Sequence, residues 1–109
     1  VVVEAGAIIR RSILMHDTRV EAGASLDTVI VDKGCTIGRD SQVGGIGDDR
    51  VNERFPQHLD SGITVLGKGA RIPSRSRLGR NVAVLSHQDF VARGPIVAES
   101  GETLGSPDA

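Results

Sequence analysis

An apolar residue returns at every sixth position over most of this 109-residue chain. The interval shortens by one residue near position 30, is lost between residues 44 and 62, and then resumes. A helix would repeat its apolar face about every 3.6 residues and a half-buried strand at every second residue, so neither element explains this spacing. The repeating positions are Val2, Ile8, Leu14, Val20, Leu26, Val31, Ile37, Val43, Leu66, Ile72, Leu78, Val84, Phe90 and Ile96.

A second set of residues, four positions after the apolar ones, is mostly small. Its members are Gly6, Ser12, Thr18, Ala24, Cys35, Ser41, Ala70 and Ser76. Six residues make one short strand and a corner, and three such units close a triangular coil of about 18 residues. The two patterns therefore predict an all-β fold, a parallel β-helix of hexapeptide repeats whose large apolar residues point into the prism.

The repeat pattern divides the chain into a domain and a tail. Residues 1–98 are expected to form the β-helix, interrupted at residues 44–62 by a protruding loop that contains glycines, charges and a proline. Residues 99–109 are acidic and contain Gly, Ser and Pro, so we expect a flexible tail. In the loop, Phe55 and Leu59 are expected either to pack back on the coil wall or to insert into a neighbouring subunit. Because Val1 already falls within a repeat, we expect the chain to be a fragment of a longer protein.

The composition narrows the setting of the protein. A single cysteine cannot form an internal disulfide, which predicts a reducing, cytoplasmic environment. That residue, Cys35, occupies a small inward position and is expected to be an unreactive thiol. No apolar stretch approaches about 18 residues and no charged-then-apolar leader opens the chain, so no membrane partner is expected.

Basic residues concentrate in the C-terminal half, although the net charge of the chain is −1. Guanidinium groups bind phosphate oxygens in pairs, and in an 18-residue coil Arg75 would stack on Arg93, where an anion would relieve their repulsion. The alternative is an outward solenoid face that is merely rich in arginine. No aromatic residues interleave with these arginines, so nucleic acid is not an expected partner. The predicted anion or effector site consists of Arg71, Arg75, Arg77, Arg80 and Arg93.

Catalytic and metal-binding motifs are not indicated. His16 is followed by Asp17, but adjacent strand residues point to opposite faces, so the carboxylate is poorly placed to orient the imidazole. His58 falls in the loop and His87 near a corner, and nothing fixes a metal-ligand geometry. The glycine cluster at residues 44–47 lacks the Lys-Ser/Thr pair and the helix of a phosphate-binding loop. We therefore expect no catalytic residue, metal or cofactor in this chain.

Two stretches, residues 12–44 and 61–84, give the chain a family resemblance. The sequence VDKG at residues 31–34, the NERFPQHLDSG linker, and the pattern GKGARIP followed by LGRN within residues 67–81 carry it. They resemble the C-terminal β-helix domain of bacterial glucose-1-phosphate adenylyltransferases and related sugar-1-phosphate nucleotidyltransferases. The resemblance implies a left-handed winding and an N-terminal nucleotidyltransferase domain, absent from this chain, that joins ATP to glucose 1-phosphate for glycogen synthesis.

The same resemblance implies a non-catalytic role for this chain. The β-helix would support subunit association, as a dimer or tetramer, and help to form a site for an anionic sugar-phosphate effector. The alternative is the β-helix of a hexapeptide acyltransferase, in which a histidine is the general base and acyl-CoA the donor. A purely structural solenoid is the third interpretation.

Overall fold

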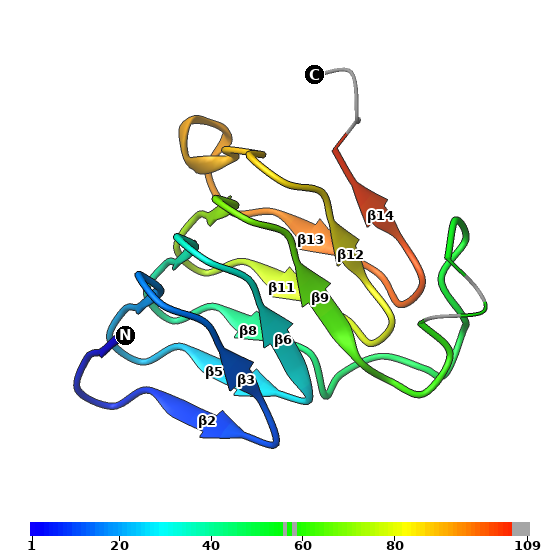
Figure 1. Cartoon of the computed structure of the whole chain (residues 1–109), viewed down its shortest axis with the longest axis horizontal. Helices are drawn as coiled ribbons and strands as arrows, with labels where there is room; N and C mark the ends of the chain where they lie inside the picture. The colour runs from blue at the N-terminus through cyan, green and yellow to red at the C-terminus, as the bar shows by residue number, and fades with distance from the viewer. Residues whose placement is uncertain (56, 58, 106–109) are drawn as a thin grey trace.

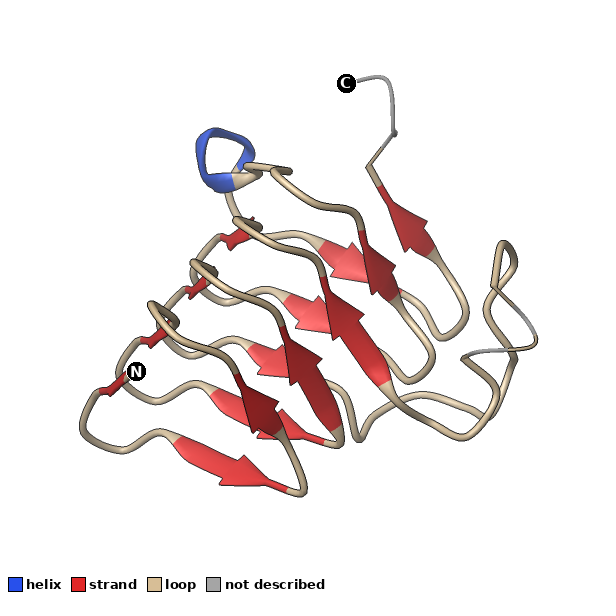
Figure 2. Cartoon of the chain, viewed as in Figure 1, coloured by secondary structure: helices blue, strands red, loops and turns tan. Residues whose placement is uncertain are grey.

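The computed structural model describes residues 1–55, 57 and 59–105, which form a three-sided parallel β-helix (Figures 1 and 2). Each coil runs through short strands joined at corners, so strands far apart in sequence lie side by side in three parallel sheets. The architecture is the left-handed parallel β-helix of hexapeptide repeats that the six-residue period and the family resemblance predict. Within the described part of the chain, no helix is long and apolar enough to cross a membrane.

The three sheets form the three sides of the prism. Sheet A has the order β1-β4-β7-β10 and contains β1 (Val2–Val3), β4 (Arg19–Val20), β7 (Thr36–Ile37) and β10 (Arg71–Ile72). Sheet B has the order β13-β11-β8-β5-β2 and contains β2 (Ile8–Arg10), β5 (Ser25–Asp27), β8 (Gln42–Val43), β11 (Arg77–Leu78) and β13 (Val97–Ala98). Sheet C has the order β14-β12-β9-β6-β3 and contains β3 (Ile13–Leu14), β6 (Val29–Val31), β9 (Thr64–Leu66), β12 (Ala83–Val84) and β14 (Thr103–Leu104).

The length of a coil varies along the stack. Val20 pairs with Ile37, which is an offset of 17 residues, whereas Leu66 pairs with Val84, an offset of 18. Leu78 pairs with Ala98, so the offset grows to 20 where the 3-10 helix η1 (Val91–Arg93) occupies the coil. The extra residues lie at corners, and the inward-facing pairs stay in register.

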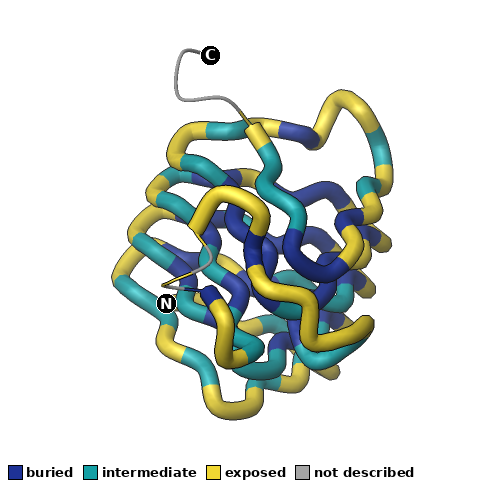
Figure 3. Tube along the Cα trace, turned by 90° about the vertical axis from the view of Figure 1, so that its right-hand side faces the viewer, coloured by how far each residue is buried: buried dark blue, intermediate teal, exposed yellow. Residues whose placement is uncertain are grey.

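The inward side chains form one continuous core along the prism. In Figure 3 the buried positions follow the inside of the stack, and exposed positions gather at corners and in the loop. Most residues of the six-residue pattern are confirmed as core. The buried ones are Val20, Leu26, Val31, Ile37, Val43, Leu66, Ile72, Leu78, Val84 and Phe90.

The phase of the pattern is wrong in the first coil. Val3, not Val2, pairs with the buried Val20. In the same way Ile9, not Ile8, packs against the core, and Ile8 is 49% exposed. Adjacent apolar residues at both places leave the phase ambiguous, and the side from β2 to β3 is one residue shorter than the sequence count assumed.

The pattern is also displaced at the far end of the stack. Ile96 is half-buried against the core, but Ala98 is the buried residue that pairs with Leu78. The 3-10 turn before β13 supplies two extra residues, which moves the inward position from 96 to 98.

The small inward positions are filled by residues whose polar atoms bond to the next coil. Thr18 Oγ1 donates to the Asp32 carbonyl at 3.3 Å, and Ser41 Oγ donates to the Pro73 carbonyl at 2.8 Å. Thr64 Oγ1 donates to the Gly79 carbonyl at 2.6 Å. Because an unpaired hydroxyl would be costly inside an apolar prism, these bonds make the small polar residues compatible with the core.

Residues 44–62 leave the coil as predicted, and the loop is fastened to the stack by two buried asparagines. Asn52 Nδ2 donates to the carbonyls of Asn81 (2.8 Å) and Glu102 (3.1 Å). Its Oδ1 accepts from the backbone N–H groups of Arg54 and Phe55 at 2.9 Å each. Asn81 Nδ2 in turn donates to the Arg50 carbonyl at 3.0 Å, so the two side chains join the loop to the fourth and fifth coils.

The tail begins later than the sequence indicates. Residues 99–105 were expected to be flexible, but β14 pairs with β12 and extends sheet C through Leu104. Ser100 is buried and accepts a hydrogen bond from the Asp48 N–H at 3.0 Å. The acidic residue Glu102 contributes a carbonyl to the Ala83 N–H, so its charge does not remove this segment from the sheet. The remainder of the predicted tail, residues 106–109, lies outside the described residues.

Candidate functional site

The five predicted effector arginines lie on different parts of the prism. Arg71 is on β10 in sheet A and Arg77 is on β11 in sheet B. Arg75 lies at the corner between these sheets, with a φ of 60°, and Arg80 follows β11 at the corner between sheets B and C. Arg93 is the last residue of η1. The sequence cluster therefore does not become one spatial cluster.

The expected stacking of Arg75 on Arg93 is not present in the strand register. An isolated bridge pairs Arg71 with Asp89, an offset of 18, but Arg77 pairs with Val97, an offset of 20. Arg93 lies within the inserted turn between these two points, and its guanidinium lies 5.8 Å from the centre of the Phe90 ring. The two-residue insertion thus removes the alignment that a constant 18-residue coil would give.

Two of these arginines already have carboxylate partners. The Arg80 guanidinium lies 3.1 Å from Asp49 in the loop, and Arg71 lies 3.9 Å from Asp89. All four side chains are substantially exposed, so each ion pair contributes little to stability and competes weakly with an external anion.

The largest cavity, of about 500 Å³, lies between the loop and the outer face of sheet B. Arg77 from β11 and Arg50 from the loop both line it, together with the carboxylates of Asp48 and Glu99. The loop wall is held by the hydrogen bond from the Asp48 N–H to Ser100 Oγ. Sequence analysis did not find Arg50, because only the loop's return over sheet B brings this residue to Arg77.

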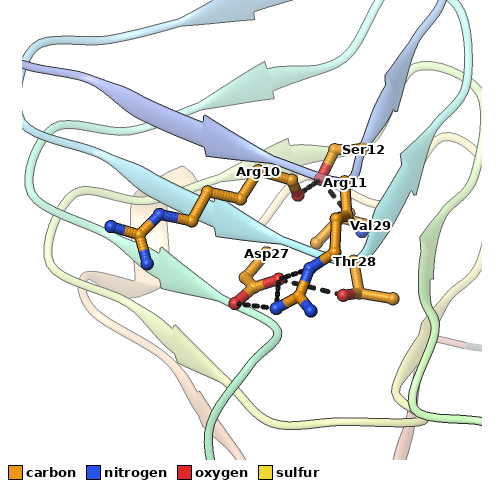
Figure 4. A network of polar contacts seen from close by, with 6 residues as sticks. All are labelled: Arg10, Arg11, Ser12, Asp27, Thr28 and Val29. Atoms are coloured by element: carbon orange, nitrogen blue, oxygen red, sulfur yellow. Dashed lines mark hydrogen bonds and ion pairs between the residues drawn. The ribbon is translucent and has the colours of Figure 1, made fainter.

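A smaller polar cavity of about 250 Å³ lies at the corner between sheets B and C. Arg80 and Asp49 line it, opposite Arg11 and Asp27. Figure 4 shows the guanidinium of Arg11 gripping Asp27, with Nη2 at 2.8 Å from Oδ1 and 3.0 Å from Oδ2. The register of β2 and β5 places Arg11 and Asp27 on successive coils, which a single linear motif does not reveal.

The network around Asp27 favours its charged form. The hydroxyl of Thr28 donates to Asp27 Oδ1 at 2.9 Å and, with the bidentate bonds from Arg11, holds the pKa of this carboxyl below its usual value of 3.8 despite partial burial. Nearby, Ser12 Oγ donates to the Arg10 carbonyl and accepts from the Val29 N–H (Figure 4). These bonds fix the corner between the first two coils.

We expect Asp27→Asn to remove a pH-dependent part of the stability. A lowered folded-state pKa gives stability that is present above the unfolded-state pKa and is lost as the pH falls through the folded-state value. The variant should therefore be about 1 kcal/mol less stable than the wild type at pH 7, and this difference should shrink to near zero by about pH 2. Urea unfolding at a series of pH values measures it. A difference that stays constant from pH 7 to 2 would contradict the role of the charge.

The histidine and cysteine positions carry no assembled catalytic group. His16 and His87 are both exposed, and His87 has a φ of 62° at a corner. His58 lies outside the described residues. Cys35 is fully buried, its Sγ lies 3.1 Å from the Gly67 carbonyl, and burial raises the pKa of the thiol, as expected for an unreactive core residue. Among the described residues, no group of three or more His, Cys, Asp or Glu side chains is placed to hold a metal ion.

Taken together, the stacked coils and buried small positions define a hexapeptide-repeat β-helix domain. A family model described as GlmU-like, C-terminal hexapeptide, matches residues 1–66. The chain belongs to this GlmU-like C-terminal hexapeptide family. No solved structure is significantly similar to the chain.

Two curated relatives match almost the whole chain. The glucose-1-phosphate adenylyltransferase of Thermomicrobium roseum is 39% identical over 98 residues, which cover 87% of this chain and 22% of that protein. The glucose-1-phosphate adenylyltransferase of Acetivibrio thermocellus is 34% identical over 110 residues, which cover 94% of this chain and 26% of that protein. The chain thus spans about a quarter of the length of these relatives.

Proposed function

We propose that this chain is the C-terminal assembly and regulatory domain of a glucose-1-phosphate adenylyltransferase, with the chemistry carried by an N-terminal nucleotidyltransferase domain. The observation that supports this most is the match of nearly the whole chain to about a quarter of two such enzymes. In this assignment the reaction joins ATP and glucose 1-phosphate to give ADP-glucose in the cytoplasm. The β-helix itself supplies no catalytic group, metal or cofactor.

The proposed regulatory ligand is an anionic sugar phosphate. The cavity between the loop and sheet B supports this assignment best, because Arg77 and Arg50 converge there from elements far apart in sequence. Guanidinium groups bind phosphate oxygens with paired, charge-assisted hydrogen bonds. Of the five arginines predicted from sequence, Arg77 is the one that lines this cavity, and Arg80 lines the smaller cavity near Arg11.

The full-length protein that carries this chain tests both parts of the proposal. It should form ADP-glucose from ATP and glucose 1-phosphate, and fructose 1,6-bisphosphate should change the rate. Arg77→Gln should raise the half-effective concentration of the bisphosphate about tenfold, since a lost charge-assisted bond is worth about 1.5–3 kcal/mol. The matched change Arg10→Gln, at an exposed arginine of sheet B outside this cavity, should leave that concentration unchanged.

The outcomes separate the two claims. Absence of ADP-glucose formation would contradict the enzyme assignment. Formation of ADP-glucose with equal bisphosphate responses in the wild type and Arg77→Gln would retain that assignment and reject the cavity as the effector site.

A further inference from the structure

The outward face of sheet C is apolar, unlike the outward faces of the other two sheets. Across β3, β6, β9 and β12, the residues that pair on this face are Ile13, Ile30, Val65 and Ala83, and the row ends at Thr103 on β14. The central positions on the outward face of sheet A are Arg19, Thr36 and Arg71. Those of sheet B are Ser25, Gln42 and Arg77.

This face is only partly covered within one chain. The side chain of Ile13 is 59% exposed, and Ile30 and Val65 are half-buried. Parallel sheets whose strands are apolar on both faces are normally covered on both faces. An apolar outer face on one side of an otherwise polar prism therefore indicates a surface that is covered in the working assembly.

The loop divides the face into a raised half and an open half. Phe55 and Leu59 lie over the half formed by β9 and β12, where they line a hollow of about 300 Å³ with Val65, Ala83 and Leu85. Leu59 is 7% exposed, so it packs back on the coil wall, whereas Phe55 remains 39% exposed. The other half, around Ile13 and Ile30, has no loop above it in the described part of the chain.

We infer that the sheet C face binds a second copy of this chain. A twofold axis in the interface, parallel to the strands, turns one prism end over end relative to the other. The raised half of each copy then lies over the open half of the other, and each Phe55 contacts the Ile13–Ile30 surface opposite it. Such an interface is self-complementary, as a twofold dimer requires. The inference rests on the proposed role in subunit assembly and assigns the surface that performs it.

The dimensions of the face are sufficient for a dimer of modest affinity. Five strands spaced by about 4.8 Å and a side of about six residues give an area roughly 24 Å by 20 Å. Roughly 500 Å² per copy, or about 1,000 Å² in total, is the size at which specific interfaces begin. We therefore expect dissociation within the concentration range of an ultracentrifuge experiment.

Sedimentation velocity on the 109-residue chain, from about 1 to 500 µM, tests the inference. The wild type should dimerise, and Ile13→Glu and Phe55→Glu, which change opposite halves of the face, should each weaken the dimer at least tenfold. Val97→Glu is the matched control, because Val97 is 70% exposed at an outward position of sheet B. It should dimerise like the wild type, and circular dichroism should show the same fold for all four proteins.

Each contrary result has a distinct meaning. A wild type that is monomeric at every concentration overturns the inference, as do dimers that Ile13→Glu and Phe55→Glu leave intact. A dimer that only Val97→Glu weakens places assembly on sheet B instead. None of these results bears on ADP-glucose formation by the full-length protein, so the proposed enzyme assignment is tested separately.

Discussion

Ile37→Ala should destabilise the β-helix by about 3–5 kcal/mol. Ile37 is fully buried at the centre of the stack, with inward neighbours Val20 and Ile72 on the adjacent coils. Truncation removes apolar contacts and leaves a cavity that stiff neighbouring strands cannot close, which places the cost in the upper part of the range for such substitutions. Because a domain of this size has a total stability of about 5–15 kcal/mol, the loss should be large in urea unfolding.

The matched control is Ile8→Ala. It deletes the same atoms at a strand position that is 49% exposed, so the expected loss is below about 1 kcal/mol. Equal losses at the two positions would mean that Ile8 faces the core, as the uninterrupted six-residue count predicts, and that the register of the first coil is wrong.

Asn52→Ala should cost about 2–4 kcal/mol, although residue 52 belongs to a loop. The side chain is fully buried and makes hydrogen bonds with the carbonyls of Asn81 and Glu102, two N–H groups of the loop, and the Thr103 hydroxyl. Removing the amide leaves these groups without their partner, and buried polar groups without partners are costly. Urea unfolding measures the loss. Hydrogen exchange should also show lost protection at the N–H groups of residues 54 and 55.

Val51→Ala provides the comparison for Asn52. Its side chain is 44% exposed one residue away, and its truncation should change stability by less than about 0.5 kcal/mol. If Asn52→Ala were equally mild, the loop would not depend on this side chain for its attachment to the last coils.

The fold was predictable because every coil repeats the same physical requirement. An inward apolar residue such as Leu26 or Ile72 and a small residue two positions before it recur on each side of the prism, and the recurrence is visible without knowledge of the coil's exact length. The phase failed only where this constraint weakens. At the first coil, Ile8 and Ile9 are both apolar, and the sequence alone does not say which one has a neighbour above it.

The interactions that depend on insertions were not predictable from the period. Asn52 is a polar residue in a loop of polar residues, and no local pattern marks it as a buried hub. The arginine site failed for a related reason. The two residues added in the η1 turn displaced Arg93 from its expected place over Arg75, and the return of the loop brought Arg50, which was not a candidate, beside Arg77.

The changing offset between paired strands, from 17 to 18 to 20 residues, has a consequence for how such proteins diverge. Each corner absorbs extra residues locally, and even the long excursion after Val43 returns the chain to sheet C, where Val65 pairs with Ile30. Lineages of this architecture can therefore gain or lose surface segments at any corner while every sheet contact is inherited unchanged. Chain length and gapped identity then record the history of the corners, whereas descent is best traced coil by coil through the inward rows.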